Sequence, residues 1–128
     1  MTSVLNVDTI ADKAGTGPVG LTKQSAAKSW SHSNLTSTPS IGDSVNLSSI
    51  TDNGNADFTW NWSNNFNSVN YTFMGSGTWS SSGNNSGGGV LPEANITSSA
   101  VRARTYRLDS LGALELVDNM TTCHGDLA

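Results

Sequence analysis

The chain lacks the residues that define several common classes of protein. Its 128 residues include one cysteine, and six lysines and arginines against ten aspartates and glutamates. One cysteine excludes an internal disulfide framework. Six dispersed basic residues are too few for a nucleic-acid-binding surface. No apolar run approaches the roughly 18 residues that span a membrane. We therefore expect no nucleic-acid partner and no membrane insertion.

Uncharged polar residues are abundant instead. Serine, threonine and asparagine make up 48 of the 128 residues, whereas charged residues are 12% and hydrophobic residues 35%. Hydroxyls and amides must therefore solvate most of the surface, and the core is small for this chain length. Small cores are commonly completed by association of subunits. The composition favours a subunit of a larger assembly.

Residues 43–62, "DSVNLSSITDNGNADFTWNW", contain two alternating runs around a cluster of Asp, Asn and Gly. This pattern predicts a β-hairpin with its turn at 52–54, because Asn and Gly tolerate positive φ. The apolar positions of the first run change face near 48–49, which predicts a bulge there. In the second run Phe58, Trp60 and Trp62 alternate with polar residues. We expect these three rings to face the core or a partner subunit.

Similar short runs recur at 69–73, 100–108 and 120–124, separated by turn residues. In the second of these, Arg102 and Arg104 share one face. Such a series predicts an all-β fold over residues 41–128, an antiparallel meander forming a sandwich or barrel-like domain. Residues 1–40 are expected to precede it as an arm, with an extended segment at 4–10, a short helix within 21–30 and a loop over 31–43.

The segment 75–89, "GSGTWSSSGNNSGGG", is expected to be a long loop. No Asp, Glu, Lys or Arg occurs from Phe58 to Pro92, and seven of the nine aromatic residues lie between Phe58 and Trp79. Two interpretations remain open: a buried centre or subunit interface where charge is costly, or a neutral aromatic surface that binds sugar. Within the loop, the candidate receptor-binding residues are Trp79, Ser81, Asn84 and Asn85.

The sequence indicates no catalytic or metal centre. Cys123 and His124 are adjacent, but neighbours in an extended strand point to opposite faces, which is poor geometry for proton transfer. Two histidines and one cysteine lack zinc-site spacing. The aspartates lack the order of a calcium loop, and the two glutamates are not paired as glycosidase acids. We expect a protein that is not an enzyme and needs no metal or cofactor.

Several motifs carry a resemblance to a known family. The N-terminal "LNVDTIADKAGTGPVGLTKQSAAKSW", with "VDTI" before a K-x-W motif, resembles the entry segment of bacteriophage tail-fibre and related virion proteins, particularly those of marine and cyanobacterial phages. The 43–62 hairpin is similar to a hairpin repeated in those proteins, and Tyr71 stands where an "NY" pair follows it. "VRARTY" and "GDLA" are also similar. The final "MTTCHGDLA" departs from the family, because it is more polar than the aliphatic-rich strand typical there.

This resemblance implies a non-enzymatic, β-rich homotrimer in the virion tail, synthesised in the host cytoplasm. Residues 1–40 would serve attachment or trimerisation. The implied partners are other copies, other tail or baseplate proteins and a glycan on the host surface. Two alternatives remain: a capsid decoration or assembly protein that binds only other virion proteins, and a stand-alone carbohydrate-binding module. The absence of a secretory signal pattern disfavours the second.

Overall fold

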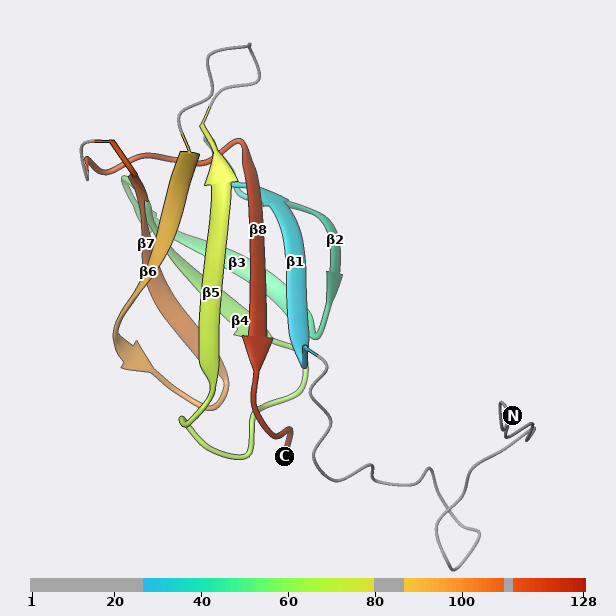
Figure 1. Cartoon of the computed structure of the whole chain (residues 1–128). Helices are drawn as coiled ribbons and strands as arrows, with labels where there is room; N and C mark the ends of the chain where they lie inside the picture. The colour runs from blue at the N-terminus through green and yellow to red at the C-terminus, as the bar shows by residue number, and fades with distance from the viewer. Residues whose placement is uncertain (1–26, 80–86, 110–111) are drawn as a thin grey trace, which may run out of the picture.

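A computed structural model describes residues 27–79, 87–109 and 112–128, which form one antiparallel sheet that nearly closes into a barrel (Figure 1). This part of the chain contains no helix. The two edge strands, β2 and β3, are separated in sequence by Asn46 alone, which has a positive φ of 57°. The strands are β1 (Ser29–Asn34), β2 (Ser40–Val45), β3 (Leu47–Gly54), β4 (Asp57–Trp62), β5 (Thr72–Thr78), β6 (Gly87–Ile96), β7 (Ala100–Arg107) and β8 (Asp118–His124).

The strand order is β2-β1-β8-β5-β6-β7-β4-β3. The all-β, barrel-like prediction is confirmed, but the meander order is wrong. The reason is the connection from β4 to β5, which leaves β4 to pair with β7 and β5 to pair with β8. Strands β4 to β7 therefore follow a Greek-key order. Strand β8 then separates β5 from β1.

Strand β1 lies where the sequence predicted the end of a helix and the start of a loop. Its inward positions are Ser29, Ser31 and Ser33, all buried, while Trp30 and His32 face outward. Serine at every inward position hides the apolar alternation by which a strand is normally predicted. Strand β2 likewise occupies part of the predicted loop. The other residues of the predicted arm and helix, 1–26, lie outside the described residues.

The predicted hairpin is confirmed as β3 and β4, with a register shift between Leu47 and Ser49 where the bulge was expected. The turn lies slightly later than predicted, because β3 continues to Gly54. The reversal uses positive φ at Gly54 (128°) and Ala56 (56°). A carboxylate oxygen of Asp52 accepts a 2.8 Å hydrogen bond from the Gly54 N–H, which fixes the chain as it enters the turn.

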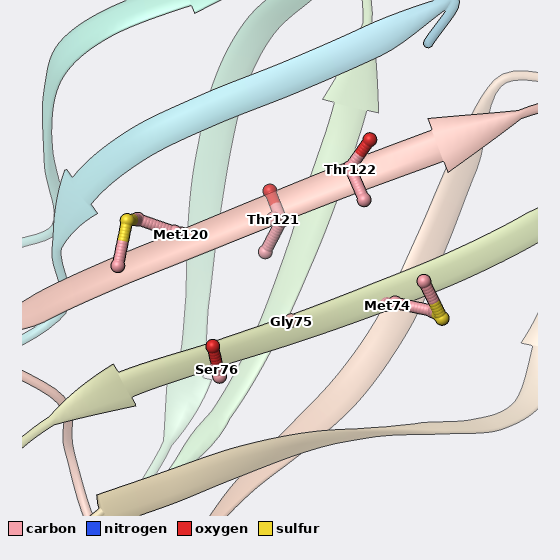
Figure 2. A pocket seen from close by; sticks show the side chains of 6 residues that line it. All are labelled: Met74, Gly75, Ser76, Met120, Thr121 and Thr122. Carbon is pink, nitrogen blue, oxygen red and sulfur yellow. The ribbon is translucent and has the colours of Figure 1, made fainter.

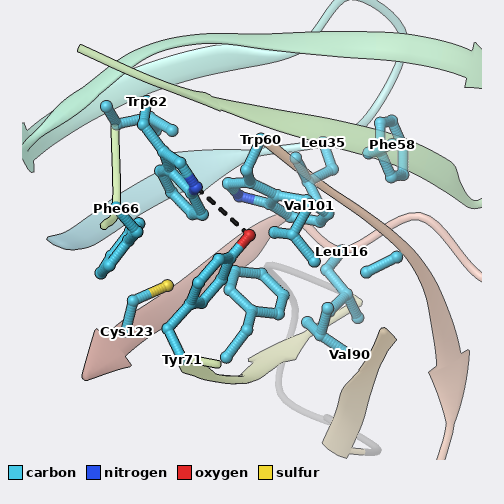
Figure 3. Packing of buried hydrophobic residues seen from close by; sticks show 13 residues of the cluster. Leu35, Phe58, Trp60, Trp62, Phe66, Tyr71, Val90, Val101, Leu116 and Cys123 are labelled. Atoms are coloured by element: carbon cyan, nitrogen blue, oxygen red, sulfur yellow. Dashed lines mark hydrogen bonds between the residues drawn. The ribbon is translucent and has the colours of Figure 1, made fainter. Parts of the chain in front are cut away.

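The aromatic residues of β4 form the centre of the core, as predicted. Phe58 and Trp60 are fully buried, and the Trp60 ring lies 5.2 Å from the Phe73 ring. Phe66 and Tyr71, in the connection from β4 to β5, stack with their ring centroids 4.3 Å apart (Figure 3). The cluster is centred on β4, β5 and β7 and also receives residues from β3, β6, β8 and the connections between strands. Its members are Leu35, Leu47, Phe58, Trp60, Trp62, Phe66, Tyr71, Phe73, Val90, Val101, Ala103, Leu116 and Cys123.

The interior along β1 and β8 is small and polar. The Ser31 and Thr121 hydroxyls lie 2.7 Å apart, and Asn119 donates a 3.2 Å hydrogen bond from Nδ2 to Ser33 Oγ. These groups are buried, so their mutual hydrogen bonds offset the cost of removing them from water. On the adjacent strand β5 the inward position Gly77 has no side chain. The barrel is therefore apolar on one side and polar on the other.

Both ends of the glycine-rich segment 75–89, which was predicted to be a loop, belong to strands. Strand β5 runs to Thr78 and β6 starts at Gly87, so strands replace both ends of the predicted loop. Glycine is required because other groups lie against the backbone: a Cβ on Gly77 would overlap the carbonyl oxygen of Asp118, and one on Gly88 would overlap the side chain of Leu116. These glycines therefore permit close strand packing.

This close packing can be tested with Gly77→Ala. We expect the free energy of unfolding to fall by about 1–3 kcal/mol, because the added methyl group must displace backbone atoms of β8. The matched control is Gly42→Ala, whose Cβ would lie 3.4 Å from its nearest neighbour, an ordinary contact. Urea unfolding of both variants is the measurement. Equal stability of the two would contradict the packing described for Gly77.

Candidate interaction surface

The outer side of strands β2, β1, β8 and β5 carries large apolar side chains. Cross-strand pairs join Val45 to Trp30, Trp30 to Thr122 and Thr122 to Met74. Directly paired residues point to the same side of a sheet, so these four form a row across four strands. Trp30 is 37%, Val45 46% and Met74 60% exposed. Leu91, 60% exposed, lies next to this row on the adjoining strand β6, which pairs with β5. We call Trp30, Val45, Met74, Leu91 and Met120 the apolar face.

A hollow of about 330 Å³ lies within the apolar face, between β5 and β8. Met120 on β8 and Met74 on β5 stand at opposite ends of it (Figure 2). The backbone of Gly75 forms part of its lining, whereas a Cβ on Gly75 would point into the barrel, within 2.6 Å of Val90 Cγ2. Its full lining is Met74, Gly75, Ser76, Met120, Thr121 and Thr122.

Charged residues border this surface. His32 Nε2 lies 3.5 Å from Asp118 Oδ1, and His32 is the cross-strand partner of Asp43 on one side and of Met120 on the other. The His32 and Asp118 side chains are both more than half exposed, so their pairing contributes little to stability. The row from Val45 to Met74 carries no charged residue, whereas Met120 lies directly beside His32.

The outer side of β4, β7 and β6 carries an ion-pair network. Arg102 donates to both carboxylate oxygens of Asp57, at 2.9 Å from Nε and 2.5 Å from a terminal nitrogen. Arg104 Nε lies 2.5 Å from Oε1 of Glu93. The other carboxylate oxygen of Glu93, Oε2, lies 3.7 Å from Arg102 Nε. The hydrogen bonds from Arg102 lower the pKa of the Asp57 carboxyl, and Asp57 raises the pKa of Arg102. Arg102 and Arg104 share one face, as predicted.

A ladder of neutral polar groups covers the outer side of β3 and β4. Asn61 donates from Nδ2 to Ser49 Oγ and to Thr51 Oγ1, each at 3.1 Å. Asn53 donates from Nδ2 to Thr59 Oγ1 at 2.8 Å. We call Ser49, Thr51, Asn53, Thr59 and Asn61 the amide–hydroxyl ladder. It presents hydrogen-bonding groups without charge, and it lies across the barrel from β8 in the strand order.

Trp79, one of the candidate receptor-binding residues, is partly buried. It follows directly after β5 and packs against the aromatic cluster, and the Arg107 guanidinium lies 5.4 Å from its ring centroid. Ser81, Asn84 and Asn85 lie outside the described residues, so a receptor site in this segment stays a prediction.

Sequence reasoning missed the apolar face because its alternation is inverted. In "SWSHSN" and "DNMTTCH" the larger residues Trp30, His32 and Met120 face outward, while smaller serines, threonines and an asparagine face inward. Both segments show the alternation of large and small residues with period two that is typical of a strand. The usual assumption that the larger residues point inward would have assigned the wrong face.

The surroundings of Cys123 do not suit nucleophilic catalysis. The thiol is buried, which raises its pKa to about 12, and His124 is exposed on the opposite side of β8, as predicted. Among the residues that the structure describes, no three His, Cys, Asp or Glu side chains gather as metal ligands. The same residues include no helix with the length and apolar character needed to cross a membrane.

The Asp57–Arg102 pair predicts a pH dependence of stability. The folded pKa of Asp57 lies below its unfolded value, so the pair stabilises the fold above about pH 4, and this contribution is lost as the pH falls through the folded pKa. Asp57→Asn should lower stability at pH 7, and its difference from wild type should shrink on acidification. Urea titrations at several pH values measure this, with the exposed Asp43→Asn as control. A pH-independent difference would contradict the ionic contribution.

The partial burial of Trp79 predicts a structural role for its ring. Trp79→Ala should lower the free energy of unfolding by about 2 kcal/mol, less than the loss for a fully buried tryptophan. Arg107→Gln should cost about 0.5–1 kcal/mol through the lost cation–π contact together with the lost ion pair between Arg107 and Asp109, which is partly exposed. The 61% exposed Leu108, changed to Ala, serves as the neutral control. If Trp79→Ala unfolded with the same free energy as wild type, the Trp79 ring would not support the core.

Comparison with known proteins identifies no relative of this chain. No protein-family model, no curated protein and no solved structure matches this chain. The fold and the surfaces described above are therefore the basis on which a function can be argued, together with the motif resemblance noted in the sequence.

Proposed function

We propose that this chain is a non-enzymatic structural protein of a bacteriophage virion, of the tail-fibre type. It acts as a homotrimer in the virion tail, contacts other tail or baseplate proteins and takes part in recognition of a host-surface glycan. The motif resemblance supports the class of protein. The observation that carries the proposal is the apolar face on a barrel whose own core is already filled.

The apolar face supports assembly with other proteins. Its five side chains expose on the order of 500 Å² of apolar surface, a size at which the largest apolar patch of a protein is often functional. Tryptophan and methionine are enriched at protein interfaces, while charged residues are depleted at their centres. Because these side chains point away from the core, their apolar character is not needed to fill the interior of the single chain. Contact with another virion subunit explains them.

The amide–hydroxyl ladder supports the glycan part of the proposal. Its side chains are exposed or half-buried, uncharged and rich in donors and acceptors, which suits a ligand made of hydroxyl groups. The ladder and the apolar face lie on different sides of the barrel. One copy can therefore contact other subunits and a sugar at the same time. A trimer would present three such sites and raise avidity through effective concentration.

A capsid decoration or assembly protein that binds only virion proteins is the second candidate. The hydrogen bonds within the ladder favour it, because Asn61 and Asn53 already donate to neighbouring hydroxyls. A sugar would have to replace these bonds. A stand-alone carbohydrate-binding module fits less well, since the apolar face would then stay in water.

Binding to host surfaces separates these candidates. The full chain is tested for binding to lipopolysaccharide and to whole cells from a panel of cyanobacteria. We expect binding by wild type and at least a fivefold loss in Thr51→Ala/Asn61→Ala, since each lost hydrogen bond weakens binding by about 1 kcal/mol. Leu108→Ala, an exposed position outside both the ladder and the apolar face, is the control and should bind normally. Absence of binding by wild type to every sample would exclude the glycan role and favour the assembly protein.

A further inference from the structure

We propose that the two edge strands β2 and β3 bind residues 4–10 of the same chain, "VLNVDTI", as an added strand that closes the barrel. The added strand pairs antiparallel with β3. We call the place between the edges of β2 and β3 the seam. The inference goes beyond the proposed function, because it concerns how the fold is completed and does not depend on a role in a virion.

The open edges of the sheet are the first observation that supports an added strand. Within the part of the chain that the structure describes, β2 pairs with β1 alone and β3 with β4 alone. The two edge strands are joined at Asn46 and spread apart from there (Figure 1). Each edge therefore presents backbone N–H and C=O groups that no neighbouring strand of the sheet binds. Such an edge binds an extended segment by strand addition.

Two isoleucines show that the interior lacks cover at the seam. Ile41 on β2 pairs with the buried Ser33, and Ile50 on β3 pairs with the buried Trp60, so both isoleucines point inward. Ile41 is nevertheless 36% exposed, as much as the outward-facing Trp30 at 37%, and Ile50 is only partly buried. A strand with apolar residues on its inner face would remove both isoleucines from water, which is favourable.

The sequence of residues 4–10 has the pattern that the seam requires. In an extended conformation Leu5 and Val7 share one face, whereas Asn6 and Asp8 share the other. The first pair suits the interior beside the isoleucines, and the second pair stays in water. The segment is rich in β-branched residues and contains no proline, so each of its residues can donate a backbone hydrogen bond to a neighbouring strand.

The chain enters the barrel beside the seam. The described residues begin at Ala27, and Trp30 is already the direct partner of Val45 at the end of β2. Residues 11–26 can span up to about 50 Å, whereas neighbouring strands lie only about 5 Å apart, so residues 4–10 can reach the seam of their own barrel. A segment that leads from the far end of the seam back toward Asn46 runs opposite to β3. This direction gives the antiparallel pairing.

Hydrogen exchange tests the proposal in the full chain. The amide protons of β2 and β3 that point into the seam should exchange slowly in wild type. Leu5→Asp/Val7→Asp places two carboxylates on the inner face of the segment, where burial is costly. The seam protons should then exchange roughly 100-fold faster, while those between β5 and β8 should keep their wild-type rates. Exchange of individual amides followed by NMR is the measurement.

The matched control is Val4→Asp/Asn6→Asp, which adds the same charge to the outer face of the same segment. It should keep the wild-type protection of the seam. Fast exchange of the seam protons in wild type would overturn the proposal, and so would equal protection in the two double variants. These outcomes do not bear on glycan binding, which the ladder variants test separately.

A mixing experiment tests whether the segment closes its own barrel. Isotope-labelled Leu5→Asp/Val7→Asp is mixed with an excess of unlabelled wild type, unfolded in urea and refolded. We expect the labelled seam protons to remain fast, because each wild-type segment occupies the barrel to which it is attached. Recovery of their protection would overturn the proposal, since it would mean that the segment is exchanged between copies.

Discussion

The hydroxyl group of Tyr71 joins the end of β4, the connection from β4 to β5 and the turn between β6 and β7. It accepts a 3.3 Å hydrogen bond from the Trp62 indole (Figure 3). It also lies 2.8 Å and 3.0 Å from the carbonyl oxygens of Thr97 and Ala100. Burial raises the pKa of this hydroxyl, so it stays a neutral donor. The junction holds the connection from β4 to β5 against the turn between β6 and β7. The Greek-key order depends on it, because this connection is what separates β5 from β4.

The unequal filling of the barrel interior explains the unusual outer surface. Around Tyr71 the interior is occupied by aromatic rings, whereas along β1 and β8 it is occupied by serines, threonines and Asn119. A barrel of this size has limited internal volume, and the rings of β4 already reach across to Phe73 on β5. Small inward residues on β1 and β8 accommodate them. The large residues of those two strands, Trp30 and Met120, are therefore on the outside.

The sequence was sufficient to predict the parts of the fold in which apolar residues alternate. The hairpin of β3 and β4, its bulge and the burial of Trp60 follow from local patterns. Strand β1 could not be predicted in this way, since its inward serines carry no apolar signal. The glycines at the ends of β5 and β6 resemble a loop unless the neighbouring strands are known. The strand order was also out of reach, because β1 pairs with β8 about 90 residues away, as in the contact of Ser31 with Thr121.

The position of β8 makes the apolar face a product of the finished chain. Trp30 lies on the first strand and Met74 on the fifth, and these strands become neighbours of a common surface only when β8 inserts between them. Before that step neither the row of side chains nor the lining of the hollow is complete. A chain in which β8 has not paired with β1 and β5 therefore lacks the continuous row from Trp30 to Met74. Any process that recognises this row distinguishes chains with β8 in place from chains without it.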